Sequence, residues 1–208
     1  MLKRLLWAIA YRTTQQYNVV KIRSLPPGYY DTDTRIFHAM MQLVVDHVEV
    51  SMSAAHISMN DYDLGFWEFL WMCLPPLISP DWMIRSKWRG LAFLAQEKRL
   101  GDPGLPPEQR HPQQARAASE IEEIYLWWVE IRPKRPDPDD VAGLDDVLKK
   151  VQDYKHKTRI FNSDMLPKSL DAELQAAIET ADRVEKAYAD QDKDMMKRII
   201  DILPYMWI

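Results

Sequence analysis

Residues 34–52 read TRIFHAMMQLVVDHVEVSM, and this stretch decides the fold class. Its apolar side chains recur at spacings of three and four, which is the periodicity of an amphipathic α-helix. The predicted buried face consists of Phe37, Met40, Met41, Val44, Val45 and Val48. Residues 31–33, which read DTD, supply candidate N-caps, and their acids suit the positive end of the helix dipole. The sequence therefore predicts a long central helix.

A row of polar residues follows the opposite face of this predicted helix. Its members are Arg35, His38, Gln42, Asp46 and Glu49. At the angular spacing of an α-helix they fall within an arc of roughly 80°, so that each can reach the next. The row offers imidazole, amide and carboxylate groups but no lysine, which is unusual for a solvated face. Three interpretations stay open: a solvated face, a buried polar network or a metal site.

The same helical periodicity covers most of the rest of the chain. Further helices are predicted over 2–15, 79–100, 113–131, 144–156, 168–190 and 192–203. Residues 101–112 contain four prolines and two glycines, which predicts a loop. Tyr17–Leu25 is β-branched and partly alternating, and it is the strand that the pattern predicts. The expected fold class is mainly α, a helical domain with one short N-terminal strand and a C-terminal helical appendage.

The domain boundary is expected at a peptide rich in proline and charge, residues 132–140. Residues 1–138 are predicted to form an aromatic-rich helical core domain. Residues 141–208 are predicted to form a charged helical appendage. Its apolar stripe is Leu170, Leu174, Ile178, Ala181, Val184 and Tyr188.

Composition excludes several functional classes. The net charge of −4 provides no global basic field that would attract nucleic acid. A single cysteine, Cys73, rules out a disulfide or a multi-cysteine zinc site within one chain. The apolar run 66–78 is too short to span a bilayer, and MLKRLLWAIA lacks a clear signal-peptide cleavage site. We therefore expect a cytoplasmic protein with no membrane association.

No complete catalytic or cofactor motif is present, so a non-enzymatic protein without a cofactor is favoured. The alternative is a metal-dependent nucleotide phosphohydrolase or nuclease. Its magnesium or manganese ligands would be His38, Asp46, Glu49, Glu120 and Glu123. The spacing of Glu120 and Glu123 is similar to the ExxE half of the magnesium motif in helical nucleotide pyrophosphohydrolases. The ExxD in this chain, Glu179 to Asp182, lies beyond the proline-rich peptide rather than on the next helix.

Two groups of basic residues interleaved with tryptophan are candidates for binding a partner, because such groups can grip phosphates or stack on bases. The candidate binding residues are Trp82, Arg85, Trp88 and Arg89 in the first group and Trp127, Arg132 and Arg135 in the second. Lys and Arg stems lying over a Trp-rich surface would produce the same pattern.

Two longer strings carry a resemblance to known sequences. The first is YDTDTRIFHA at 30–39, running into QLVVD at 42–46; the second is EIEEIYLWW at 120–128, closing on RPKRPDP at 132–138. Both resemble recurrent sequences in uncharacterised proteins of tailed bacteriophages, and the resemblance covers residues 17–138. It implies a phage gene expressed in a bacterial host cytoplasm, and it transfers no catalytic residue.

These observations favour a phage-encoded, non-enzymatic accessory protein that binds a host protein, a nucleic acid or a nucleotide. The expected partner is another protein or a second copy of the chain, with nucleic acid as a further possibility. The alternatives are the metal-dependent enzyme described above and a structural component of the virion, which would form a symmetric oligomer.

Overall fold

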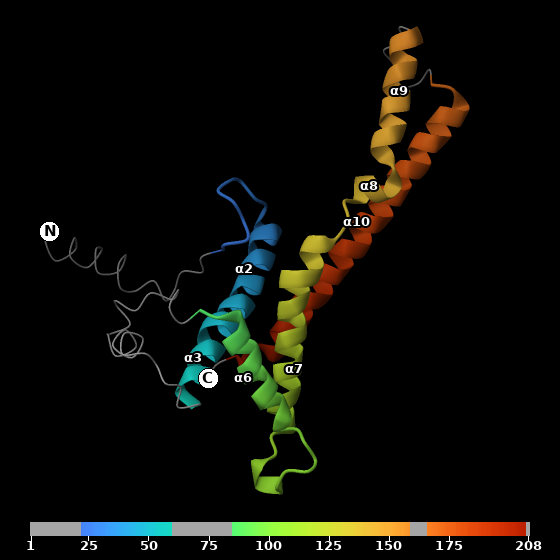
Figure 1. Ribbon diagram of the computed structural model, residues 1–208. Coiled ribbons are helices and arrows are strands. Elements are labelled where there is room, and N and C mark those ends of the chain that lie inside the picture. Colours follow the sequence, from blue (N-terminus) through green and yellow to red (C-terminus); the bar gives the residue numbers. More distant parts are fainter. Residues whose placement is uncertain (1–21, 60–84, 159–165, 207–208) are drawn as a thin grey trace, which may run out of the picture. The chain divides into compact units, whose positions relative to one another are not determined.

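The computed structural model describes residues 22–59, 85–158 and 166–206, and in these ranges the protein is mainly helical, as the periodicity predicts (Figure 1). The predicted helix 2–15 lies outside the described residues. Of the predicted strand Tyr17–Leu25, residues 22–25 are described, and they form a turn. The Arg23 N–H donates to Gln42 Oε1 instead of pairing with a neighbouring strand. The strand is therefore not supported.

The chain divides into two compact units. Unit 1 comprises residues 1–129 and 196–208, and unit 2 comprises residues 130–195. This division differs from the one expected from composition, because residues 130–138 group with unit 2 and the last thirteen residues return to unit 1. Within unit 1, Ile199 and Ile202 are buried and Arg198 pairs with Glu120, which accounts for the return.

Unit 1 is organised around the predicted central helix. It begins as α2 (Thr32–Asp46), continues as the π-helix η2 (His47–Met52) and ends as α3 (Ser53–Met59). Met41, Val44 and Val48 are fully buried, as the periodicity predicts. π-Helical turns are rare in proteins, and those that occur are often found at functional sites.

Two more helices complete the described core of unit 1. Helix α6 (Lys87–Arg99) starts at the N-cap Ser86, whose side chain accepts from Arg89 N–H, and it contacts α3, η2 and α7. The loop after α6 holds the short 3-10 helix η3 (Pro107–Gln109). Helix α7 (Pro112–Leu126) continues as the π-helix η4 (Trp127–Ile131) and also contacts α2. The core side chains that it contributes are Ala115, Ala117, Ala118, Ile121, Ile124, Tyr125 and Trp127.

Unit 2 is built on a helical hairpin. After η5 (Arg132–Lys134), the short α8 (Pro138–Ala142) contacts α9 (Leu144–Thr158), and both lie beside part of α10 (Lys168–Ile202). An ion pair between Lys150 and Glu173 joins α9 to α10, which lie side by side in Figure 1. Helix α10 is continuous where the sequence predicts two helices, since no glycine or proline interrupts it. The 3-10 helix η7 (Leu203–Tyr205) follows it.

None of the helices in the described ranges combines the length and the apolar character that crossing a membrane requires.

Candidate functional site

The polar row is buried only in part: Arg35 is exposed, Asp46 and Glu49 are half-buried, and His38 and Gln42 are buried. His38 is 9% exposed and Gln42 is 4% exposed, so the interpretation as a solvated face is wrong for these two residues. The Ser24 hydroxyl lies 2.8 Å from His38 Nδ1. Gln42 receives the Arg23 N–H at 3.0 Å and donates to Asp46 Oδ1 at 2.9 Å. A hydrogen-bonded network therefore includes His38, Gln42 and Asp46 together with residues 23 and 24.

Arg85 completes this network from outside the helix. Its guanidinium donates to Asp46 and, at 2.5 Å, to Glu49 Oε2. The second oxygen of Glu49 accepts from the Tyr125 hydroxyl at 2.8 Å. Burial disfavours the charged guanidinium, but hydrogen bonds and charge attraction from the two carboxylates outweigh burial and raise the pKa of Arg85 above its ordinary value. These hydrogen bonds link Asp46 of α2 and Glu49 of η2 to Arg85, and Glu49 to Tyr125 of α7.

The second predicted carboxylate group is also engaged by an arginine. Arg198, on the part of α10 that belongs to unit 1, donates to Glu120 and Glu123 at 2.6 Å each. Burial opposes its charge, and the two carboxylates raise the pKa of Arg198 nevertheless. The two carboxylate groups are thus held by different arginines. In the described ranges, no three His, Cys, Asp or Glu side chains are placed so as to hold a metal ion together.

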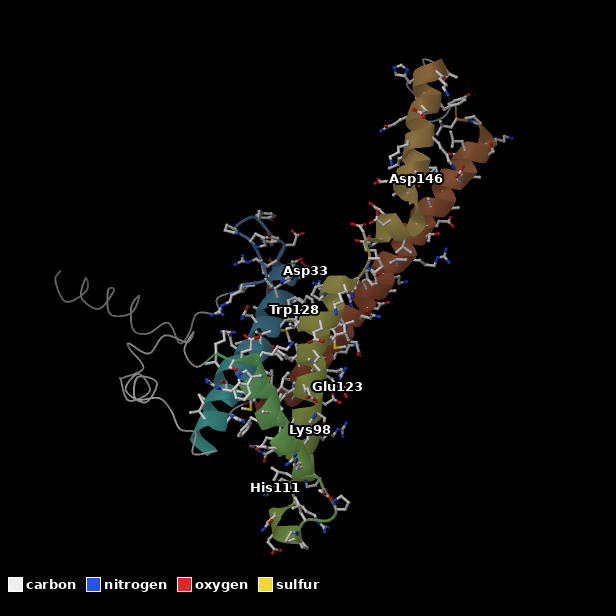
Figure 2. The ribbon with its side chains drawn as sticks, in the orientation of Figure 1. Asp33, Lys98, His111, Glu123, Trp128 and Asp146 are labelled. Carbon is white, nitrogen blue, oxygen red and sulfur yellow. The ribbon has the colours of Figure 1, made fainter. Side chains whose placement is uncertain are left out.

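The tryptophans predicted to bind a partner have different surroundings. Trp127 is 6% exposed and packs on Phe37, so it belongs to the core. Its neighbour Trp128, which Figure 2 labels, makes edge contacts with Phe37 and His38 at centroid distances of 5.4 and 5.0 Å. Trp88 is 54% exposed, and the Arg89 guanidinium lies 5.5 Å from its ring centroid. Trp82 lies outside the described residues.

The predicted basic group at 132–135 is paired within unit 2. Arg132 and Arg135 both bind the carboxylate of Asp192, at 3.0 and 2.8 Å. Arg135 also stacks on the Tyr188 ring, 4.7 Å from its centroid. Because one carboxylate already neutralises part of this charge, these two arginines are poorly placed to grip phosphates.

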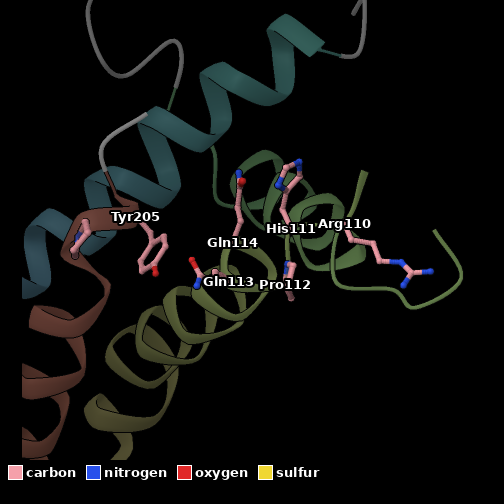
Figure 3. A pocket seen from close by; sticks show the side chains of 7 residues that line it. Arg110, His111, Pro112, Gln113, Gln114 and Tyr205 are labelled. Atoms are coloured by element: carbon pink, nitrogen blue, oxygen red, sulfur yellow. The ribbon is translucent and has the colours of Figure 1, made fainter. Parts of the chain in front are cut away.

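Two neighbouring cavities of about 430 and 470 Å³ in unit 1 share Gln113 and Tyr205 as lining residues. In the first of them, Tyr205 and Gln113 face each other, whereas Arg110 extends away from the cavity (Figure 3). The Arg110 guanidinium donates to the carbonyls of Pro103 and Leu105 and so holds the predicted loop 101–112 together. The second cavity is lined by both charge signs, because Arg116 and Arg198 lie with Glu120 and Asp201.

A buried histidine in η2 is a further unusual group. His47 is 6% exposed, and its Nε2 has no hydrogen-bond partner in the described part of the chain. Burial disfavours the charged imidazolium and lowers the pKa of His47 to about 4. The side chain is therefore neutral in the folded protein at neutral pH.

The buried His47 predicts that the protein loses stability in weak acid. The unfolded chain binds a proton near pH 6.5 and the folded chain only near pH 4, so the stability is full above pH 6.5 and falls as the pH drops through this window. At pH 5 the loss is about 2 kcal/mol relative to pH 7.5. Urea unfolding of the wild type, His47→Leu and the exposed control His156→Gln at both pH values measures it. An equally large pH dependence in His47→Leu would contradict this assignment.

Sequence patterns did not reveal several residues of these networks. Arg198, Tyr125 and Asp192 are each more than fifty residues from the side chains that they bind. No periodicity or local motif relates positions so far apart in the chain. One feature of the sequence did point to such a network, namely the lack of lysine in the polar row. A row without lysine fits a network that an arginine from elsewhere in the chain completes.

Comparison with protein-family models, with curated proteins and with solved structures finds no match to this chain.

Proposed function

We propose that this chain is a non-enzymatic accessory protein of a tailed bacteriophage, and that it acts in the host cytoplasm by binding another protein. The phage origin rests on the resemblance carried by residues 30–46 and 120–138. The protein-binding function rests on the surface of unit 2.

The observation that carries the proposal is the distribution of apolar side chains in unit 2. Its buried apolar side chains are small: Val147, Val151, Ala177 and Ala181. Four others are exposed, namely Ile131 at 58%, Val141 at 49%, Leu148 at 40% and Ile178 at 36%. A two-helix hairpin packs closely along one stripe, and small residues suit that stripe. The four exposed apolar side chains are available to a partner.

The alternative functions need charged groups that the protein already pairs internally. A metal-dependent hydrolase would have to take Asp46 and Glu49 from Arg85 before a cation could bind. Binding of nucleic acid through the predicted basic residues would have to take Arg132 and Arg135 from Asp192. Removing one partner of a half-buried ion pair leaves a poorly solvated charge, so both alternatives carry a free-energy cost that protein binding avoids.

We expect the full-length chain to retain a protein from a nuclease-treated lysate of infected bacteria, and to bind it again after purification. The double variant Val141→Ser/Leu148→Ser should weaken that purified complex about tenfold or more, because it removes exposed apolar area. The matched control is Asp146→Ser/Lys149→Ser, an exposed ion pair in the same region. Dissociation constants from calorimetry provide the measurement.

Three outcomes would contradict the proposal. Retention that depends on nucleic acid would favour nucleic-acid binding. A symmetric oligomer of the chain alone in light scattering would favour a virion component. Equal weakening by the control variant would show that the exposed apolar side chains have no specific role.

A further inference from the structure

Unit 2 contains a groove between the start of α8 and α9 on one side and α10 on the other. Its lining residues are Asp137, Pro138, Asp139, Leu144, Ile178, Ala181, Asp182 and Glu185. The cavity volume is about 310 Å³, at the lower end of the range for ligand pockets. A groove of this size accepts a few side chains of a peptide.

Regular local structure forms both walls of this groove. On α10, residues 178, 181, 182 and 185 follow the i, i+3, i+4, i+7 spacing of one helix face. On the other side, Gly143 has a φ of +64° and ends α8 in the left-handed conformation, between the lining residues Asp139 and Leu144. This turn leads directly into α9, and the Asp137 side chain caps α8 by accepting from the Asp139 N–H.

The groove combines an apolar floor with an acidic rim. Pro138, Leu144, Ile178 and Ala181 supply apolar surface, and Ile178 remains 36% exposed. The rim carries four carboxylates, those of Asp137, Asp139, Asp182 and Glu185. An apolar surface alone would accept many partners, whereas the charge of the rim selects among them.

Several acids of unit 2 form ion pairs, whereas the rim carboxylates form none within the described ranges of this unit. Asp192 binds two arginines, Glu173 binds Lys150 and Asp146 binds Lys149. Between residues 130 and 158 and between 166 and 195, none of the four rim carboxylates is part of an ion pair. Within these ranges, no ion pair therefore offsets the negative charge of the rim.

We propose that this groove docks a basic, partly apolar segment of the protein partner; the inference rests on the proposed protein-binding function. Lys and Arg carry an aliphatic stem and a charged end, which match the apolar floor and the acidic rim respectively. Neighbouring aliphatic side chains of the same segment would pack on Ile178 and Leu144. The four carboxylates then speed association and fix the orientation of the segment.

The probe is a fluorescein-labelled, amidated peptide of lysine and leucine with its leucines at helical spacing, titrated against the full-length chain by fluorescence anisotropy. We expect Asp182→Asn/Glu185→Gln to weaken binding about tenfold or more, because both carboxylates lie on the groove face of α10. Ile178→Ser should weaken it as well, and that loss should persist when salt screens the charges. A peptide with glutamate in place of lysine should not bind.

The matched control is Asp153→Asn/Asp194→Asn, which removes two exposed carboxylates of unit 2 outside the groove. It makes the same change in net charge and should change the affinity by less than about twofold. Equal weakening by both double variants would show diffuse attraction to an acidic surface and overturn the proposal. Unaltered binding by the groove variant would overturn it as well. Thermal melts monitored by circular dichroism establish that each variant is folded.

The purified protein partner separates failure of this inference from failure of the proposed function. If Asp182→Asn/Glu185→Gln binds that partner as tightly as the wild type does, the groove is not the docking site, while the protein-binding function stands. If no protein partner is retained by the wild type, both fail. If the groove variant alters self-association in light scattering, the occupant is a second copy of the chain, and the proposed partner segment is wrong.

Discussion

Replacing Gly90 by alanine is expected to lower the free energy of unfolding of unit 1 by about 4 kcal/mol, above the usual cost of overpacking. A Cβ atom at this position would lie 2.0 Å from the Val48 carbonyl oxygen and 2.8 Å from its carbonyl carbon. Both atoms are backbone, so no side-chain rotation relieves the contact. Helix α6 would have to move away from η2, and the adjacent hydrogen bond from Ser86 N–H to the Glu49 carbonyl, now 2.8 Å long, would stretch.

The sign of this effect makes the test decisive. Glycine in a helix interior normally costs about 0.5–1 kcal/mol relative to alanine, so an uncrowded site would be stabilised by the same change. Gly28→Ala is the control, because its added Cβ would meet the Tyr30 ring at an ordinary 3.5 Å. All eight tryptophans lie in the residues of unit 1, so urea unfolding followed by tryptophan fluorescence reports on this unit alone. A Gly90→Ala variant as stable as the wild type would show that α6 does not cross η2 this closely.

The central helix illustrates what the sequence predicts well. Its apolar positions recur with the helical period, and Phe37, Met41, Val44 and Val48 are buried as expected. The period does not reveal how many sides of a helix are covered. Residues 23–24 contact His38 and Gln42, and Trp128 of η4 packs on His38, so that both side chains are buried, while Ile36 and Leu43 remain 52% and 43% exposed. Hydrophobicity alone would have predicted that Ile36 and Leu43 are buried and that His38 and Gln42 are exposed.

The metal ligands and basic binding residues illustrate what the sequence cannot predict. Asp46, Glu49, Glu120 and Glu123 have the right chemistry for a cation, and helical spacing does bring neighbours within each pair together. Whether a metal ion or an arginine satisfies them depends on side chains from other elements, Arg85 and Arg198. The choice between a site and a structural network is therefore made by tertiary contacts.

Replacing Glu49 by alanine is expected to lower the free energy of unfolding of unit 1 by about 3 kcal/mol, because it breaks two partly buried interactions at once. Arg85, whose side chain is 15% exposed, loses one of its two carboxylates, and the fully buried Tyr125 hydroxyl loses its acceptor. Glu122→Ala is the matched control, since it removes one ion pair with the more exposed Lys98 and should cost less than about 1 kcal/mol.

Manganese distinguishes the network from a metal site in the same experiment. If Asp46 and Glu49 serve only Arg85, millimolar manganese or magnesium leaves the melting temperature of the wild type and of Glu49→Ala unchanged. If the carboxylates bind a cation in solution, the metal stabilises the folded wild type in proportion to its affinity, and the variant loses that gain. A metal-dependent rise in melting temperature that disappears in Glu49→Ala but persists in Glu122→Ala would overturn the structural interpretation. Asp46 and Glu49 would then bind the cation in place of Arg85. Because these carboxylates are the proposed metal ligands of the hydrolase, that result would favour the hydrolase over the binding protein.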